Sequence, residues 1–242
     1  MPLLKKIDNT QETFIIVMPS LNEEAYIEET LTSWATLMNE CIGSEILVVD
    51  GGSKDKTVVK IKNLEESIPA LHLLRVKSKM YGHALQAGYR HATKSNHEWV
   101  FQTDSDGHFE PSDFYKLWRK RKSSNFIIGR RYKRQDGVHR IILARMIELW
   151  IYMLFGLKIK DSNTPFRLMN RMYLGKMLDQ VPKNTIAPNI FLSIFAKKDG
   201  QNLYHVPVKH RQRKKDEYNN LKLLKGALLG FAELLFLRLR LV

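Results

Sequence analysis

Short apolar runs alternate with helical repeats through the first half of the chain, and this alternation constrains its fold more than any other feature of the sequence. Each run is bounded by polar residues, Gly or Pro, which is typical of a buried β-strand. Between the runs, apolar residues such as Ile27, Leu31 and Trp34 recur three or four positions apart, as on one face of a helix. The pattern predicts an α/β fold with a mainly parallel sheet and helices on both faces. The predicted strands are residues 14–18, 45–49, 71–76, 98–103 and 125–128, and the predicted helices are residues 27–38, 58–65, 84–92 and 113–122.

Length and composition fit a single domain that is not exported. The chain has 242 residues, 44% of them hydrophobic, which is enough to bury a full core. Its one cysteine, Cys41, excludes an intramolecular disulfide framework and fits a reducing compartment. The first residues, MPLLKKIDNTQETF, contain no apolar segment of the kind that a secretory signal requires. We therefore expect a cytoplasmic protein.

The chain is strongly basic. Its 39 Lys and Arg residues against 25 Asp and Glu give a formal net charge of +14. Much of the excess lies in residues 119–145 and 197–225. This charge indicates an anionic partner, which can be nucleic acid, an acidic membrane surface or a phosphorylated substrate, and charge alone does not choose among them.

Two segments outside the alternating region, residues 141–157 and 221–242, are rich in apolar residues but carry scattered charges. The charges make both segments poor candidates for a membrane span. Apolar helices beside basic clusters fit amphipathic helices that lie in a membrane interface, peripheral to the bilayer. Core helices are the alternative for both segments, and an oligomer interface is a further alternative for the second.

Two carboxylates, Asp104 and Asp106, stand where the apolar run at residues 98–103 ends. Open α/β sheets bind their ligands at the carboxyl ends of the strands. Neighbouring carboxylates repel each other unless a cation neutralises them, and hard oxygen ligands suit Mg²⁺ or Mn²⁺. The pair therefore indicates a metal that holds the phosphates of a substrate, with an ordinary surface turn as the alternative.

The first two predicted strands also end in polar motifs. The first runs into Pro19, Asn22 and Glu23, and the second runs into Asp50, two glycines and Ser53. Anionic or nucleotide ligands are bound where a strand ends and a helix begins. The alternative is structural, because Ser53 can cap the helix that follows and the glycines can simply form the turn.

Taken in this order, the motifs PSLNE, VVDGGSKDKT and TDSDGHFEP resemble those of the family 2 glycosyltransferases of the GT-A fold. Later motifs extend the resemblance: GHA at residues 82–84, GRRY at residues 129–132 and DSNTPFR at residues 161–167. The last two are typical of the branch that contains dolichyl-phosphate mannose synthase and the bacterial polyprenyl-phosphate sugar transferases. The chain departs from the family pattern at Met80 and Pro165, where many relatives have glycine, and again after residues 206–208.

The resemblance implies roles for individual residues. Asp104 and Asp106 would hold the metal and the diphosphate, and His108 would be either a third metal ligand or a solvent-facing turn residue. Asp161 would be the general base if the acceptor is a hydroxyl group, with a hydrogen-bonded turn residue as the alternative. The implied nucleotide contacts are Pro19, Asn22, Glu23, Asp50, Ser53, Gly82 and Asp104. The implied phosphate or acceptor contacts are Arg131, Arg140, Arg167 and Arg213.

The expected activity is inverting, metal-dependent transfer of a sugar from a UDP- or GDP-linked donor to a polyprenyl or dolichyl phosphate at the cytoplasmic membrane face. We expect residues 1–220 to form the GT-A domain, with residues 14–110 for the nucleotide sugar and 111–220 for the acceptor. Residues 221–242 would bind the membrane or a second copy of the chain. Transfer to a sugar hydroxyl of a cell-envelope glycan is the alternative. A non-catalytic module for anionic membranes or nucleic acid would explain the charge but not the three strand-end motifs, so no nucleic-acid partner is expected.

Overall fold

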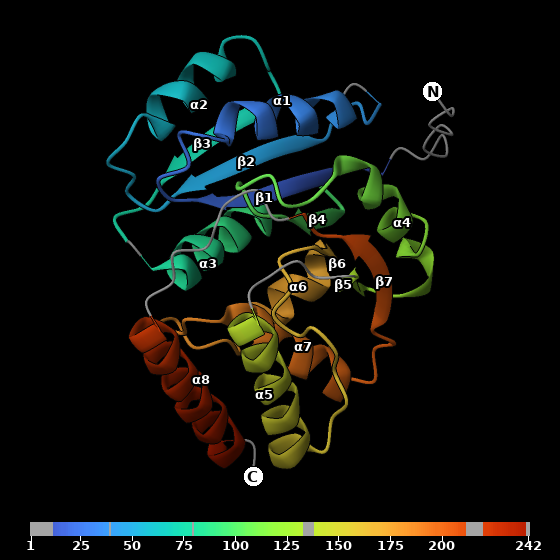
Figure 1. Cartoon of the computed structure of the whole chain (residues 1–242). Helices are drawn as coiled ribbons and strands as arrows, with labels where there is room; N and C mark the ends of the chain where they lie inside the picture. Colours follow the sequence, from blue (N-terminus) through green and yellow to red (C-terminus); the bar gives the residue numbers. More distant parts are fainter. Residues whose placement is uncertain (1–11, 39, 79, 133–137, 212–219, 241–242) are drawn as a thin grey trace.

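A seven-stranded sheet crosses the centre of the molecule and carries helices on both faces (Figure 1). The computed structural model describes residues 12–38, 40–78, 80–132, 138–211 and 220–240. The strands lie in the order β3-β2-β1-β4-β6-β5-β7. Their bounds are β1 (Phe14–Ser20), β2 (Glu45–Asp50), β3 (Leu71–Arg75), β4 (Trp99–Gln102), β5 (Phe126–Tyr132), β6 (Arg167–Asn170) and β7 (Tyr204–Lys209).

Four neighbouring strands, β3, β2, β1 and β4, are parallel, which confirms the mainly parallel sheet that the alternating pattern predicts. β6 is antiparallel to both β4 and β5, and β7 is parallel to β5. Ser20 pairs with Asp50 across β1 and β2, and Val17 pairs with Gln102 across β1 and β4. The three strands that precede the polar motifs therefore end at the same edge of the sheet, where open α/β sheets bind ligands.

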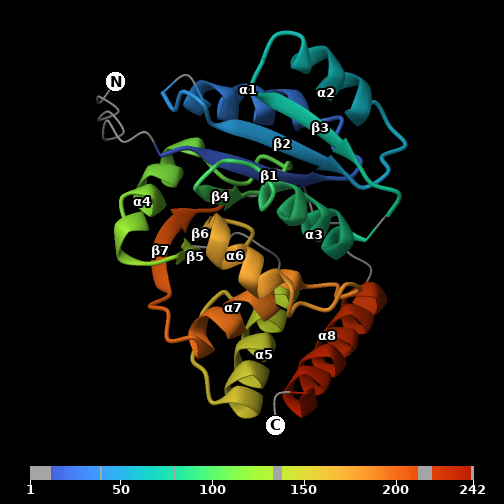
Figure 2. The same ribbon diagram turned by 180° about the vertical axis from the view of Figure 1, so that it is seen from behind.

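Helices cover the sheet in two layers, and Figures 1 and 2 show these layers from opposite sides. Side chains of α1, α2 and α4 pack on one face, and side chains of α3, α6 and α7 pack on the other, with α5 and α8 beyond them. The bounds are α1 (Ile27–Met38), α2 (Thr57–Glu65), α3 (Tyr81–Ala92), α4 (Phe114–Trp118), α5 (Val138–Phe155), α6 (Arg171–Leu178), α7 (Pro188–Lys198) and α8 (Asn220–Arg240).

The first residues of β1 are all apolar because helices cover both faces of this strand. Phe14 and Ile16 point into the core beneath α1, whereas Ile15 and Val17 point into the core beneath α3, and all four are at most 1% exposed. A strand covered on both faces has no polar side. Gly88 lets α3 come close to this strand, because a Cβ atom there would lie 2.5 Å from Cγ1 of Val17.

The five predicted strands and the helices predicted at residues 27–38, 58–65 and 84–92 are confirmed. The helix predicted at residues 113–122 is wrong in length, since only Phe114–Trp118 is α-helical, between the 3₁₀ turns Pro111–Asp113 and Arg121–Ser123. β6, β7, α6 and α7 were not predicted. β6 is only four residues long and begins with an arginine, and β7 contains Pro207, so neither strand has a clear apolar signature.

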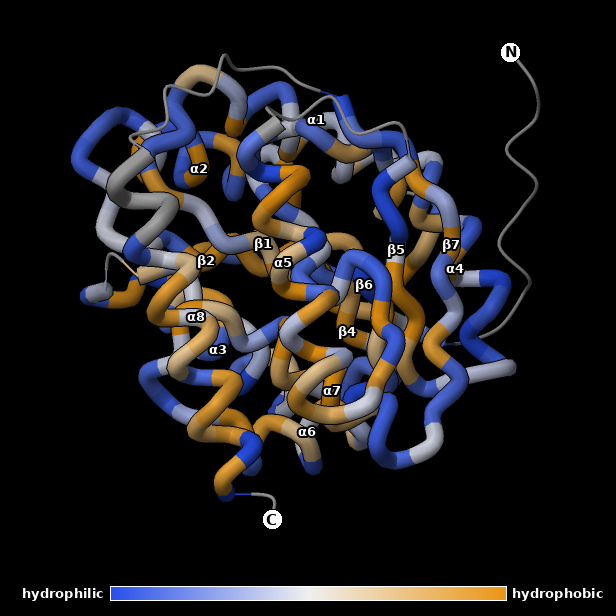
Figure 3. Tube along the Cα trace, turned by 60° about the horizontal axis from the view of Figure 1, so that its bottom comes forward, coloured by the Kyte–Doolittle hydropathy of each residue, from blue (hydrophilic) through white to orange (hydrophobic). Residues whose placement is uncertain are grey.

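Helices α5 and α8 lie side by side, and the ring of Trp150 contacts that of Phe231 with 4.9 Å between centroids. Both helices bury a few side chains, including Ile151, Leu234 and Leu237. Both also leave large apolar side chains exposed, and Figure 3 shows the apolar character of the two helices. Within the described ranges, no helix combines the length and the apolar character needed to cross a bilayer. The exposed apolar residues are Ile142, Met146, Leu149, Tyr152 and Met153 on α5, and Leu228, Leu229, Leu235, Phe236 and Leu239 on α8.

Candidate active site

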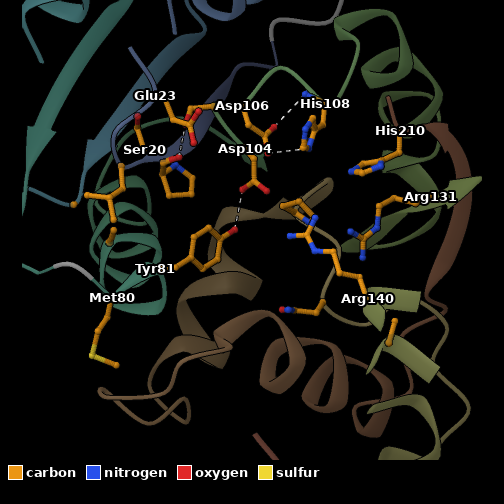
Figure 4. A pocket seen from close by; sticks show the side chains of 18 of the residues that line it. Ser20, Glu23, Met80, Tyr81, Asp104, Asp106, His108, Arg131, Arg140 and His210 are labelled. Carbon is orange, nitrogen blue, oxygen red and sulfur yellow. Dashed lines mark hydrogen bonds and ion pairs between the residues drawn. The ribbon is translucent and has the colours of Figure 1, made fainter. Parts of the chain in front are cut away.

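A cavity of about 460 Å³ opens at the carboxyl edge of the sheet (Figure 4). Loops that follow β1 and β4 form one side, and the end of β5, the start of α5 and the loop before β6 form the other. The acidic pair after β4 and two of the expected arginines therefore meet across one space. The expected site residues that line this cavity are Pro19, Glu23, Asp104, Asp106, His108, Arg131, Arg140 and Asp161.

The two carboxylates of the acidic pair differ in their electrostatic environment. Burial and the neighbouring charge of Asp106 raise the pKa of Asp104 above its ordinary value. Burial acts in the same sense on Asp106, but hydrogen bonds and the charge of His108 outweigh it and lower the pKa of Asp106. The nearer oxygen of Asp106 lies 3.0 Å from Nδ1 of His108. A carboxylate held at a raised pKa beside a second carboxylate is the electrostatic condition that a bound cation relieves.

Two imidazoles lie beside the acidic pair. His108 is 9% exposed and lines the cavity, so the solvent-facing alternative for this residue is wrong. His210 also lines the cavity, and its ring centroid lies 5.1 Å from that of His108. His210 was not predicted from the sequence to belong to the site. His210 directly follows the end of β7, a position that indicates a site residue, but β7 was itself not predicted.

Arg131, near the end of β5, is held by Asp161. Its Nε and Nη2 donate to the two carboxylate oxygens of Asp161 at 3.0 and 2.6 Å, and its backbone N–H donates to the same carboxylate at 3.0 Å. The backbone N–H of Asp161 donates to Oε1 of Glu148 on α5 at 3.0 Å. Asp161 has a φ of 50°, a left-handed conformation in which Asp and Asn are favoured among non-glycine residues. Its carboxylate is therefore engaged with Arg131 in a well-defined turn.

One face of α5 forms a wall of the cavity. Arg140, Leu143, Ala144 and Ile147 all line it, and their spacing of three, four and seven residues places them on one side of a helix. The wall therefore begins with a guanidinium group and continues as apolar surface. Leu21, Met80 and Pro165 add further apolar side chains to the cavity.

Arg167 does not reach the cavity, contrary to expectation. Its side chain is fully buried, and its guanidinium group donates to the backbone carbonyls of Ser162, Thr164 and Asn189 at 3.0, 2.7 and 3.1 Å. Charge-assisted hydrogen bonds of this kind fix the local backbone. The expectation that Arg167 contacts a phosphate is therefore wrong. Its guanidinium group instead supports the loop before β6, whose residues line the cavity.

Three of the expected nucleotide contacts, Asn22, Asp50 and Ser53, do not line the cavity. Asn22 and Ser53 join the loops after β1 and β2 to each other, and Asp50 holds the second of these loops together. The Ser53 hydroxyl accepts a hydrogen bond from the N–H of Asn22 at 2.9 Å, and Oδ1 of Asn22 accepts one from the N–H of Lys54 at 2.9 Å. The buried carboxylate of Asp50 accepts from the N–H groups of Gly52 and Ser53 at 3.2 and 3.0 Å. The N-cap residue of α2 is Lys56, and the N–H of Thr57 in the first turn donates to Oδ1 of Asp55 at 3.0 Å. The Ser53 hydroxyl is bonded to Asn22, so the capping alternative for Ser53 is wrong as well.

Two further expectations concern Gly82 and Arg213. A Cβ atom at Gly82 would lie 2.2 Å from the carbonyl oxygen of Thr185, so this glycine permits close packing between the start of α3 and the loop before α7. It does not line the cavity. Arg213 lies outside the described residues.

The mainly parallel sheet, with an acidic pair after a central strand and two arginines across the cavity, defines a glycosyltransferase of the GT-A fold. The chain belongs to the family described as Glycosyl transferase family 2, whose profile matches residues 15–188.

Known proteins similar to this chain agree with that assignment. A dolichyl-phosphate beta-glucosyltransferase of Trichomonas vaginalis is 27% identical over 70% of this chain and 57% of its own length. The UDP-N-acetylglucosamine–dolichyl-phosphate N-acetylglucosaminyltransferase of Methanococcus voltae is 23% identical over 80% of this chain and 84% of its own length. These names match the polyprenyl-phosphate sugar transferase branch of the family.

Among solved structures, glucosyl-3-phosphoglycerate synthase of Mycobacterium tuberculosis in complex with phosphoglyceric acid superposes with a TM-score of 0.72 at 17% identity. The match covers 94% of this chain and 80% of the other. The same enzyme has been crystallised with Mn²⁺, UDP and glucosyl-3-phosphoglycerate. This likeness confirms the fold class.

Proposed function

We propose that this protein transfers a sugar from a nucleotide diphosphate sugar to a polyprenyl phosphate, with inversion at the anomeric carbon of the sugar. The observation that carries the proposal is the composition of one cavity: an acidic pair, two arginines and an apolar helix face surround the same space. These three features suit a metal-bound diphosphate, an anionic acceptor group and a hydrocarbon chain, respectively. The names of the curated relatives support the same class of acceptor.

The donor set of the cavity fits a divalent cation. Asp104 and Asp106 offer carboxylate oxygens, and the imidazoles of His108 and His210 lie close by, a mixture that Mn²⁺ tolerates better than Mg²⁺. Within the described ranges no three such side chains form a complete cluster, and Mg²⁺ sites of this type are commonly completed by water and substrate phosphates. When bound, the cation would act as a Lewis acid that offsets the charge developing on the leaving nucleotide.

The nucleotide end of the cavity is built from the loops that follow β1 and β2. Pro19, Ser20, Glu23 and Gly51 line it there. A Cβ atom at Gly51 would lie 3.1 Å from the carbonyl oxygen of Ser78, so a larger residue would crowd this wall. We assign the nucleotide sugar to residues 14–110 and the acceptor to residues 111–220, because the cavity lies between side chains of these two parts of one domain.

The acceptor end of the cavity is cationic. Arg131 and Arg140 line it, and planar guanidinium groups bind phosphate oxygens at several points. A phosphate acceptor is already anionic and attacks without giving up a proton to a strong base. A sugar hydroxyl needs a base, and the carboxylate of Asp161, the candidate from the sequence, is held in its ion pair with Arg131. The geometry therefore favours the phosphate over the hydroxyl alternative.

The exposed apolar residues of α5 and α8 support peripheral attachment to a membrane. The exposed residues Ile142, Leu149 and Met153 repeat along one side of α5, whose other side lines the cavity. Basic side chains at Lys225, Arg238 and other positions of these helices suit anionic headgroups. We propose that these faces bring the cavity to the surface where a polyprenyl phosphate resides.

A transfer experiment tests the proposal. The protein is incubated with labelled UDP- or GDP-sugars, Mg²⁺ or Mn²⁺, and either polyprenyl phosphate or a soluble glycan acceptor. We expect label to enter the organic phase in the presence of the lipid phosphate and the cation. Label that appears only on the glycan would contradict the proposed acceptor and support the hydroxyl alternative.

A further inference from the structure

A line of hydrogen-bonded side chains runs from the interior of the molecule to the acidic pair. The Tyr81 hydroxyl donates to Oδ1 of Asp104 at 2.9 Å (Figure 4). The Tyr81 oxygen accepts from Nε2 of Gln102 at 3.0 Å. Nδ2 of Asn189 in turn donates to Oε1 of Gln102 at 2.9 Å. Gln102 and Asn189 are at most 1% exposed, so water does not compete for the bond between these two side chains.

Asp104, at the end of the line that faces the cavity, determines which group donates in each of these hydrogen bonds. An ionised carboxylate can only accept hydrogen bonds, so the Tyr81 proton points to Asp104 and the Tyr81 oxygen must accept from behind. Gln102 then has to turn its amide NH₂ toward Tyr81, which leaves its carbonyl oxygen to accept from Asn189. The Tyr89 hydroxyl lies behind both amides, 2.9 Å from Oδ1 of Asn189 and 2.9 Å from Oε1 of Gln102. Each bond in such a line polarises the next, and here all of them point toward Asp104.

The far end of the line is anchored by Arg167. Its Nη1 donates to the backbone carbonyl of Asn189 at 3.1 Å and lies 3.4 Å from the hydroxyl of Ser193, which itself donates to that same carbonyl at 2.8 Å. Asn189 stands in the first turn of α7, so the helix cannot shift without breaking these bonds. The fully buried guanidinium group of Arg167 thus holds Asn189, the residue on which the line depends.

We infer that Tyr81 is the positioning residue of the acidic pair: backed by Gln102 and Asn189, it fixes one oxygen of Asp104 and leaves the other facing the cavity. This inference rests on the proposed metal and nucleotide site. Tyr81 begins α3 and Gln102 ends β4, so no sequence pattern indicates that the two side chains meet. Partners that orient a metal-binding side chain in this way change metal affinity by about 10- to 100-fold when they are removed.

The variant Tyr81→Phe tests the inference, because it keeps the ring and its packing and removes only the hydroxyl. The matched control is Tyr173→Phe, which removes the hydrogen bond from that hydroxyl to Asp199 at 3.1 Å, outside the cavity. The readouts are the affinity for Mn²⁺ together with UDP, and separately with GDP, measured by calorimetry, and the thermal midpoint of unfolding. We expect Tyr81→Phe to bind the Mn²⁺–nucleotide pair about 10- to 100-fold more weakly. Its thermal midpoint should stay close to that of the control.

Two other outcomes would overturn the inference in distinguishable ways. If the unaltered protein and Tyr81→Phe bind Mn²⁺ and nucleotide equally, within about twofold, the hydroxyl does not position Asp104 and the inference alone fails. If the unaltered protein binds neither nucleotide with Mn²⁺, the proposed function fails and the inference falls with it. A second variant, Gln102→Met, tests whether Gln102 acts through Tyr81. In a double-mutant cycle, the variant with both changes should bind Mn²⁺ and nucleotide no more weakly than Tyr81→Phe does alone.

Discussion

The guanidinium group of Arg131 and the carboxylate of Asp161 form a two-point ion pair in the wall of the cavity, with Nη2 to Oδ1 at 2.6 Å. Both side chains are largely buried, at 13% and 8% exposed, and Arg131 also lines the cavity. Asp161 thereby fixes the direction in which Arg131 presents its charge. Under the proposed function, Asp161 would support the binding of an anion by Arg131 and would not remove a proton from a hydroxyl group.

The ion pair predicts how Asp161→Asn behaves. Asparagine keeps the size of the side chain and tolerates the left-handed backbone at this position, so the protein should fold, with a loss of about 1–3 kcal/mol in the free energy of unfolding. Activity should fall because Arg131 is no longer held. In an Arg131→Ala background, adding Asp161→Asn should cost little more activity.

The control for this cycle is Asp199→Asn, a change at an exposed carboxylate outside the cavity. Initial rates of sugar transfer are measured for the single and double variants. A general base acts independently of Arg131, so a further loss of about a thousandfold on adding Asp161→Asn to Arg131→Ala would contradict the positioning role.

The environment of Asp104 predicts a pH-dependent stability of the metal-free protein. Burial and Asp106 hold the pKa of Asp104 above its ordinary value, so the folded protein keeps the proton to higher pH than the unfolded chain does. The stabilisation from this group is complete below the ordinary pKa of an aspartate, about 3.9, and is lost as the pH rises through the higher folded value. At about pH 8 the ionised Asp104 therefore destabilises the metal-free fold.

Asp104→Asn removes that charge while its amide oxygen can still accept the Tyr81 hydrogen bond. In the presence of EDTA we expect this variant to unfold at a higher temperature than the unaltered protein at about pH 8, with a smaller difference at about pH 5. Thermal unfolding at the two pH values measures the effect. A variant that is less stable than the unaltered protein at alkaline pH would show that Asp104 is not under electrostatic strain.

Gly82 and Gly230 form a matched pair for a stability prediction. Ala at position 82 would place Cβ 2.2 Å from the carbonyl oxygen of Thr185, whereas a Cβ at Gly230 in α8 meets nothing within 4 Å. We expect Gly82→Ala to lower the free energy of unfolding by about 1–3 kcal/mol through overpacking. Gly230→Ala should raise it by about 0.5–1 kcal/mol, since alanine favours the helix. Urea unfolding of both variants checks this, and equal effects would contradict the close packing at Gly82.

The apolar faces of α5 and α8 predict vesicle binding. Met153 and Phe236 are 61% and 64% exposed, and replacing both by Glu should weaken binding to vesicles that contain anionic phospholipid at least about tenfold. The control is Val59→Glu, which changes an equally exposed apolar residue on α2 (57%), far from these helices in Figure 1. Sedimentation with vesicles measures binding. If the double variant sediments like the unaltered protein, these faces do not contact the membrane.

The sequence allowed the strand ends of the nucleotide half to be predicted, because there each motif directly follows an apolar run. Asp104, Asp106 and Pro19 lie in the cavity for this reason. The burial of the Arg167 side chain could not be predicted from the sequence. It depends on the backbone carbonyl groups of Ser162 and Asn189, which come together only in the folded chain.

His210 and Tyr81 could not be found from the sequence for related reasons. His210 follows β7, whose short run is interrupted by a proline, so its place at a strand end was not visible. Tyr81 precedes the helix predicted at residues 84–92, and only the fold shows that it begins α3 and that β4 brings Gln102 beside it. Sequence periodicity predicts which face of an element is buried, but not which polar side chains from separate elements meet.

The most direct test of the proposed function compares polyprenyl phosphate with the corresponding polyprenol as acceptors, with labelled nucleotide sugar and Mn²⁺ present. The two acceptors share the hydrocarbon chain and differ only in the anion that Arg131 and Arg140 are proposed to meet. We predict rapid transfer to the phosphate, negligible transfer to the alcohol, and a loss of about a thousandfold with Asp106→Asn. Comparable transfer to both acceptors, or near-normal metal-dependent transfer by Asp106→Asn, would contradict the account.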